Sequence, residues 1–91
     1  MKQYTYEELC ALVEQWLAEN QNVYYYRSRN RPSKAVHRFI KLNEPICYEP
    51  HWRGGPLTFQ KGDYLHADPR DIYGLTAETL TRCYVPTEMP I

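Results

Sequence analysis

Gly62-Asp63-Tyr64-Leu65 places a glycine and an aspartate directly before an aromatic strand. Glycine can adopt a positive φ, and the carboxylate of Asp63 can accept backbone N–H groups inside a turn. Apolar and polar residues alternate in Leu57-Thr58-Phe59, and after the turn from Gln60 to Asp63 the chain returns through Tyr64-Leu65-His66. This pattern is typical of a β-hairpin, so we predict that the two segments pair across the bend. Asp63 has no carboxylate or nucleophile beside it for acid–base chemistry, which favours a structural role.

Two helices are predicted to flank the strand-rich middle of the chain. Thr5 and Glu8 have the spacing of a capping box, and apolar residues follow at helical intervals. A second, short helix is predicted to begin at Thr76, which is a favourable capping residue. Pro86 and Pro90 predict an irregular tail beyond it.

The segments between the helices are predicted to be strands, because β-branched and aromatic residues dominate them. They are Val23 to Arg27, Ala35 to Leu42, Ile46 to Tyr48, Leu57 to Phe59, Tyr64 to His66 and Ile72 to Tyr73. We therefore predict an α+β domain with a small twisted antiparallel sheet of about four to six strands. The N-terminal helix packs on this sheet, and the short C-terminal helix closes its far end.

The length of 91 residues fits a single domain with a small core. We divide it into a helical region (1–22), a sheet region (23–75) and a short helix with a tail (76–91). Eleven basic and eleven acidic residues cancel to a formal net charge of +0, so no global field selects nucleic acid or an anionic membrane. The N-terminus lacks the apolar run of a signal peptide, and no segment has the about 20 apolar residues of a membrane span. We expect a protein of the bacterial cytoplasm with no membrane partner.

Metal binding and catalysis find no support in the spacing of the reactive residues. The cysteines and histidines are widely separated: Cys10, Cys47, Cys83, His37, His51 and His66. No Cys-x-x-Cys or His-x-x-x-His pair pre-organises two ligands, and no motif orients a cysteine–histidine nucleophile pair. The odd number of cysteines also argues against a secreted disulfide framework. We predict no metal, no cofactor and no enzymatic activity.

The strongest local charge lies between Asn20 and Asn43, where six cations occur without any acidic residue. These cations are Arg27, Arg29, Arg31, Lys34, Arg38 and Lys41. In an extended chain, Arg27, Arg29 and Arg31 would point the same way. Tyr24 and Tyr26 share one face, where exposed bases could stack on them. Three interpretations stay open: an edge strand whose cations suppress aggregation, a face for an acidic protein, and a face for nucleic acid.

The loop His51-Trp52-Arg53-Gly54-Gly55 is a second candidate surface. Tryptophan and arginine are common at binding hot spots, and two glycines let a loop adjust to a partner. The alternative is that Trp52 folds back over the open end of the sheet. The candidate partner-binding residues are Tyr24, Tyr26, Arg27, Arg29, Arg31, Lys34, Arg38, Trp52 and Arg53.

The order of elements from Val36 to Tyr84 resembles that of small phage and prophage proteins that carry a Pro-Gly-Asp-Tyr motif. The matching residues are Pro45, Gly55, Gly62, Asp63, Tyr64, Leu65, Tyr73, Gly74 and Tyr84. Lys61 stands where that motif has its proline. The resemblance implies a compact antiparallel sheet with a helix packed on it, and a phage or prophage origin. It implies no catalytic residue.

From these features we predict a non-enzymatic phage or prophage accessory protein that binds and modulates an intracellular host protein, such as a defence or nucleic-acid-processing factor. One alternative is a single-stranded nucleic-acid-binding module that uses the tyrosines together with the same cations. Another is a virion structural or assembly component that self-associates through the tyrosine-rich strand. No oligomeric state is predicted.

Overall fold

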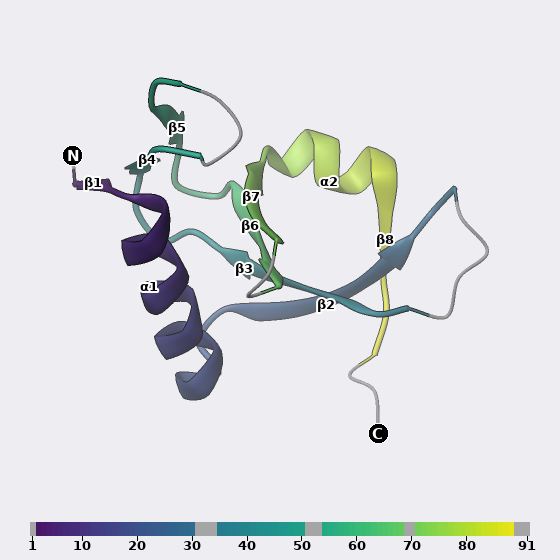
Figure 1. Ribbon diagram of the computed structural model, residues 1–91. Coiled ribbons are helices and arrows are strands. Elements are labelled where there is room, and N and C mark those ends of the chain that lie inside the picture. Colours follow the sequence, from purple (N-terminus) through teal and green to yellow (C-terminus); the bar gives the residue numbers. More distant parts are fainter. Residues whose placement is uncertain (1, 31–34, 51–53, 69–70, 89–91) are drawn as a thin grey trace.

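The computed structural model describes residues 2–30, 35–50, 54–68 and 71–88, which form the predicted α+β fold (Figure 1). Two helices and eight strands are present within these residues. In chain order they are β1 (Gln3–Tyr4), α1 (Tyr6–Glu19), β2 (Val23–Ser28), β3 (His37–Lys41), β4 (Ile46–Tyr48), β5 (Leu57–Phe59), β6 (Tyr64–Asp68), β7 (Asp71–Leu75), α2 (Ala77–Cys83) and β8 (Tyr84–Pro86).

The first helix begins at the predicted capping box. The N–H of Glu8 donates to Thr5 Oγ1 at 3.1 Å, and the N–H of Thr5 donates to Glu8 Oε1 at 2.9 Å. Hydrogen bonds from the backbone and the side chain of Thr5 to the charged carboxylate lower the pKa of Glu8. Asn20 ends the helix in the left-handed conformation, with φ 54°. Leu9 and Val13 are the residues of α1 that are fully buried.

The strands form two sheets where the sequence predicts one. The larger sheet is antiparallel with the order β7-β6-β3-β2-β8. The smaller sheet has the order β1-β4-β5, and its β1 runs parallel to β4. The predicted hairpin between β5 and β6 is wrong, because β5 pairs with β4 while β6 pairs with β3 and β7. A local sequence pattern indicates that a segment is a strand but does not indicate which strand it pairs with. The residues of β5 are equally compatible with pairing to β6, as predicted, and to β4, as observed.

The bend at Gly62 and Asp63 carries the chain from the small sheet to the large one. Gly62 has φ 93°, and Asp63 Oδ2 accepts the N–H of Gln60 at 2.9 Å, so the carboxylate forms a hydrogen bond within the turn. Leu42, which follows β3, donates its N–H to the carbonyl of Asp63 at 2.8 Å and accepts the N–H of Gly62 at 2.9 Å. The bend is therefore hydrogen-bonded to Leu42, the residue at which the chain leaves the large sheet after β3.

The large sheet is the middle layer of the molecule, and each of its faces has a core of its own. We call the face that carries Ile40 and Leu65 the α1 face, because α1 and the small sheet pack on it. Its buried residues are Leu9, Val13, Ile40, Leu42, Ile46, Tyr48, Leu65, Ala67 and Ile72. The opposite face, the α2 face, lies under α2, which runs from the end of β7 to the start of β8 (Figure 1). Its cluster consists of Phe39, Leu75 and Leu80 with the half-buried Tyr26, Tyr64, Tyr73 and Tyr84.

The second helix is capped at Thr76, whose Oγ1 accepts the N–H of Thr79 at 3.1 Å. The chain then continues as the edge strand β8, so the predicted irregular tail is corrected over Tyr84–Pro86. Pro86 fits an edge strand because its missing N–H removes no bond from the ladder. Pro90 lies outside the described residues.

The β7 edge of the large sheet is covered by tyrosine hydroxyl groups. The N–H of Ile72 donates to the hydroxyl of Tyr6, and the N–H of Gly74 donates to the hydroxyl of Tyr48, both at 3.2 Å. Gly74 has no room for a side chain, since a Cβ there would lie 2.6 Å from two ring carbons of Phe59. This glycine joins the two sheets by letting the Phe59 ring lie directly on the backbone.

The β8 edge lacks outward donors for a different reason. The N–H of Tyr84 donates to the carbonyl of Leu80, and Pro86 has no N–H. Val85 lies two residues before Thr87, whose N–H donates to β2, so the N–H of Val85 faces β2 as well. Neither edge therefore offers its described N–H groups to a further strand.

Candidate functional site

The structure describes some of the candidate partner-binding residues and leaves the others outside. Arg31, Lys34, Trp52 and Arg53 lie outside the described residues. The described candidates are Tyr24, Tyr26, Arg27, Arg29 and Arg38. All five lie in or next to the paired strands β2 and β3.

Strand β2 is an interior strand, because it pairs with β3 on one side and with β8 on the other. The interpretation of the cations as guards of an exposed edge is therefore wrong for β2. The edges of the large sheet are β7 and β8, which are protected by tyrosine hydroxyl groups, a helix carbonyl and a proline. Cations on the interior strands need another explanation.

Arg27 and Arg38 lie on the α1 face, at the end of the sheet that α1 leaves uncovered. In the register, Arg38 is opposite Tyr25 and Arg27 is opposite Val85. Figure 1 shows β2 and β3 extending well beyond α1 toward this end. Both arginines are exposed, whereas Tyr25 and Val85, which lie beside them on the neighbouring strands, are half-buried. We call these four residues the hairpin patch.

The two guanidinium groups of the hairpin patch have no partner within the described part of the chain. Neither Arg27 nor Arg38 makes a side-chain hydrogen bond or an ion pair there. A guanidinium binds a carboxylate through two parallel hydrogen bonds, and arginine and tyrosine are enriched at binding hot spots. The arrangement is suited to contact with carboxylate groups.

Arg29 has a structural role instead. Its Nη2 donates to the carbonyl of Thr81 at 3.1 Å and to that of Tyr84 at 3.5 Å. These carbonyls lie at and just beyond the last turn of α2, where a cation interacts favourably with the helix dipole. Arg29 therefore fixes the end of α2 against the β2 end of the sheet.

Tyr24 and Tyr26 share one face, as predicted, but it is the α2 face and not the face of Arg27 and Arg38. Tyr26 packs edge-on against Phe39, with ring centroids 5.5 Å apart. Tyr24 is 44% exposed, the largest exposure of any described large hydrophobic side chain. The sheet therefore separates the predicted stacking residues from the unpaired arginines.

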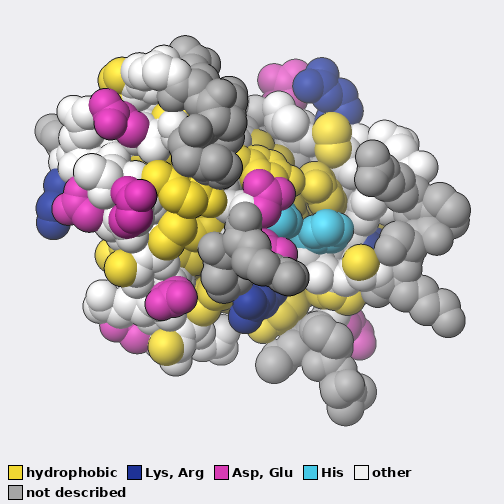
Figure 2. All heavy atoms as spheres, viewed as in Figure 1, with side chains coloured by type: hydrophobic (Ala, Val, Ile, Leu, Met, Phe, Trp, Pro, Cys, Tyr) yellow, Lys and Arg dark blue, Asp and Glu magenta, His cyan; other side chains and the backbone are white. Residues whose placement is uncertain are grey.

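The α2 face also holds a histidine–tyrosine cluster that the sequence did not indicate. The His66 ring stacks on Tyr73 with centroids 4.6 Å apart, and the hydroxyls of Tyr73 and Tyr84 are 3.3 Å apart. His37 Nδ1 lies 3.1 Å from His66 Nε2. Figure 2 shows histidine side chains at the surface beside acidic ones. His37 lies on β3 and His66 on β6, and the pairing of these two strands brings the two rings together. Because the strands are far apart in the sequence, the spacing of the histidines did not indicate this contact.

The hydrogen bonds of the pair define where its protons lie. His66 is 6% exposed, and its Nδ1 is 2.8 Å from the carbonyl oxygen of Asp71, so Nδ1 must donate. In the neutral ring Nε2 then accepts, and His37 Nδ1 must donate to it. Burial lowers the pKa of His37, and the neighbouring His66 lowers it further, while Asp68 opposes the shift. The two rings are therefore joined by a directed hydrogen bond within the α2 face.

No side-chain nucleophile is hydrogen-bonded to either histidine within the described residues. Burial raises the pKa of Tyr73, and its hydroxyl contact with Tyr84 adds to the shift, so its phenol stays protonated. The three cysteines, Cys10, Cys47 and Cys83, are half-buried free thiols. Across the described ranges, no group of three histidine, cysteine or acidic residues could hold a metal ion.

Comparison with known proteins gives no relative. No family model, no curated protein and no solved structure matches this chain. Neither described helix combines the length and the apolar character that crossing a bilayer requires.

Proposed function

We propose that this protein is a non-enzymatic phage or prophage accessory protein that binds an acidic surface of an intracellular host protein through the hairpin patch. One observation carries the proposal. Arg27 and Arg38 stand exposed and without a partner among the described residues, on interior strands beyond the reach of α1. The phage origin rests on the resemblance to the Pro-Gly-Asp-Tyr proteins.

The chemistry of the hairpin patch supports an acidic protein as the partner. Two guanidinium groups beside half-buried Tyr25 and Val85 combine carboxylate binding with a small apolar surface. The net charge of +0 supplies no long-range attraction, whereas the stretch from 20 to 43 contains no acidic residue. Attraction is therefore local, and a partner with a matching acidic patch is selected.

Both alternative functions lose their main support. A nucleic-acid module was expected to combine the tyrosines with the arginines, but Tyr24 and Tyr26 lie across the sheet from Arg27 and Arg38. Self-association through the tyrosine-rich strand requires an accessible edge, and β2 is an interior strand.

The test is affinity capture from bacterial lysate, followed by quantitative binding of the captured protein. The variant Arg27→Glu/Arg38→Glu reverses both charges of the hairpin patch. The control Lys2→Glu/Lys61→Glu makes the same change in net charge at two exposed lysines outside the patch. We expect the wild type and the control to bind the same acidic protein, and the patch variant to bind at least about tenfold more weakly, because charge pairs across interfaces couple strongly. Circular dichroism checks that all variants fold.

Equal binding by the patch variant and the control would reject the hairpin patch as the contact surface. Capture of a partner without an acidic surface would reject the proposed chemistry. A gel shift of single-stranded DNA at low salt that depends on Arg27 and Arg38 would instead favour the nucleic-acid alternative. Light scattering at two concentrations tests for self-association.

A further inference from the structure

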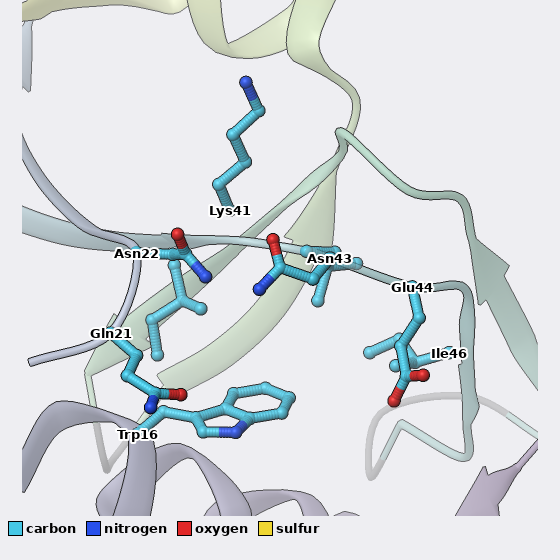
Figure 3. A pocket seen from close by; sticks show the side chains of 9 residues that line it. Trp16, Gln21, Asn22, Lys41, Asn43, Glu44 and Ile46 are labelled. Atoms are coloured by element: carbon cyan, nitrogen blue, oxygen red, sulfur yellow. The ribbon is translucent and has the colours of Figure 1, made fainter. Parts of the chain in front are cut away.

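A pocket of about 130 Å³ opens between the C-terminal end of α1 and the turn that follows β3 (Figure 3). It lies at the opposite end of β2 and β3 from the hairpin patch. Nine residues line it: Trp16, Gln21, Asn22, Ile40, Lys41, Leu42, Asn43, Glu44 and Ile46. The sequence indicated only a helix end and a turn at these positions.

The pocket has one aromatic wall and one polar wall. Figure 3 shows the side-chain amides of Asn22 and Asn43 pointing toward each other, with the indole ring of Trp16 across the pocket from them. The carboxylate of Glu44 lies to one side of the ring, and Lys41 extends away from it. Asn22 is held in position by a left-handed backbone, with φ 55°, and by accepting the N–H of Lys41 at 3.0 Å.

The polar side chains of this pocket are available to a ligand. Within the described residues, the side chains of Gln21, Asn22, Asn43 and Glu44 make no hydrogen bond, and the indole N–H of Trp16 makes none either. The floor consists of the buried Ile40, Leu42 and Ile46. Apolar walls with a few convergent polar groups are the usual composition of a small-molecule site.

The charges of the lining favour an uncharged ligand. Glu44 supplies a carboxylate at the side of the ring, which repels phosphate groups, and the Lys41 ammonium points away from the indole. The remaining polar groups are neutral amides. A carboxamide both donates and accepts hydrogen bonds, and so does a hydroxyl group. The lining therefore matches a neutral ligand rich in hydroxyl groups.

The geometry distinguishes a sugar ring from a nucleobase. A base has two apolar faces and carries its polar groups around its edge. Here polar amides stand opposite the indole face, so the ligand should be apolar on one face and polar on the other. A pyranose ring has this character, because its C–H groups gather on one face while its hydroxyls project outward. A cavity of about 150 Å³ holds one benzene ring, and a pyranose with its hydroxyl groups is larger, so this open pocket has room for one face of a single sugar ring.

We infer that this pocket binds one pyranose residue of a neutral saccharide. The C–H face of the sugar packs on Trp16, and its hydroxyl groups bond to the amides of Asn22 and Asn43. The source is either a free monosaccharide or the end of a longer chain. The inference stands apart from the proposed function, since the pocket and the hairpin patch share no residue.

The test follows the fluorescence of Trp16 in a Trp52→Phe background, which leaves a single tryptophan. The probes are methyl hexopyranosides and the matching linear oligosaccharides. A saturable change with a Kd on the order of 1 mM is expected for one sugar ring. Tighter binding of the oligosaccharides identifies a chain-end site, and equal binding identifies a monosaccharide site. The variant Asn22→Ala/Asn43→Ala should bind at least about fivefold more weakly, while the control Asn30→Ala, outside the pocket, should bind normally.

Amide chemical-shift mapping on the wild-type chain repeats the test without any substitution. Shifts confined to residues 16, 21–22 and 40–46 support the inference. It is overturned if no probe saturates below about 100 mM, a limit well beyond ordinary ligand affinities. Equal binding by the double asparagine variant, or tighter binding of adenosine than of every saccharide, also overturns it. The Arg27→Glu/Arg38→Glu variant should keep full saccharide binding, which separates this result from that for the hairpin patch.

Discussion

The two faces of the large sheet are built from different kinds of side chain. The α1 face is mainly aliphatic and is covered by a helix of 14 residues and a second sheet. The α2 face is aromatic, contains a hydrogen-bonded histidine pair, and is covered by a helix of seven residues. The first face gains its stability from dense apolar packing, whereas the second depends on ring contacts and polar bonds that respond to pH.

The largest expected effect comes from truncating one leucine on each face. Leu9 of α1 is 0% exposed and Leu80 of α2 is 2% exposed, so both substitutions to alanine remove buried side chains. We expect Leu9→Ala to cost about 4 kcal/mol of unfolding free energy and Leu80→Ala about 2 kcal/mol. The difference arises because the short α2 can shift to fill the space, whereas Leu9 of α1 packs in a core that residues of both sheets share. Urea unfolding measures both values, and equal losses would mean that both faces are packed equally tightly.

A substitution at Gly74 tests how the two sheets are joined on the α1 face. A Cβ at Gly74 meets the Phe59 ring, whereas a Cβ at Gly54 meets no atom within 4 Å. Gly74→Ala should therefore cost about 2 to 3 kcal/mol, and Gly54→Ala should be nearly neutral. Adding Phe59→Leu should recover part of the loss in the Gly74→Ala chain. Failure of that rescue in urea unfolding would place the strain elsewhere.

The fold was predictable where its cause is local. The capping box of Thr5 and Glu8, the cap at Thr76 and the positive φ of Gly62 each depend on residues close in sequence, and each is confirmed. The pairing of β5 was not predictable, because its partner is chosen by packing across the whole molecule. The contact between the Phe59 ring and Gly74 was not predictable either, because Phe59 reaches Gly74 from the other sheet.

The candidate site was predictable in its composition but not in its arrangement. The cluster of cations is evident in the sequence, yet only the register shows that Arg27 faces away from Tyr26. The residues near Arg29 in the sequence do not indicate that its side chain forms hydrogen bonds with the end of α2. The pocket at Trp16 forms from two turns that are far apart in the sequence. In the sequence alone its amide side chains are ordinary turn residues, so the pocket was not predictable.

The tyrosine hydroxyl groups at the β7 edge give a smaller expected effect. Tyr48→Phe removes the acceptor of the Gly74 N–H and leaves that donor without a partner. We expect a loss of about 1 to 2 kcal/mol, with a smaller loss for Tyr6→Phe, because Tyr6 is only half-buried. Tyr24→Phe is the control, since the Tyr24 hydroxyl makes no hydrogen bond within the described residues. Equal stability of all three variants in urea would show that the hydroxyl groups of Tyr6 and Tyr48 do not stabilise the β7 edge.

The smallest expected effect is a dependence of stability on pH that belongs to the α2 face alone. The pKa of His37 lies below its ordinary value of 6.5 in the folded chain, because burial and His66 disfavour the charged ring. Well above pH 6.5 the imidazole is neutral in both states, so it contributes no slope there. As the pH falls from 6.5 toward the lower folded pKa, the unfolded chain binds the proton first, and folding loses stability.

His37→Gln separates this titration from the packing of the same face. Glutamine keeps an N–H group that can donate to His66 but does not titrate, so the fall in the urea midpoint between about pH 7.5 and 5.5 should become shallower. Leu9→Ala lowers the midpoint at both pH values and should keep the wild-type slope, because it leaves the histidines untouched. If the urea midpoint of His37→Gln falls as steeply with pH as that of the wild type, the pH dependence comes from other groups. A Leu9→Ala chain with an altered slope would show that the two faces are coupled through the sheet and do not contribute independently.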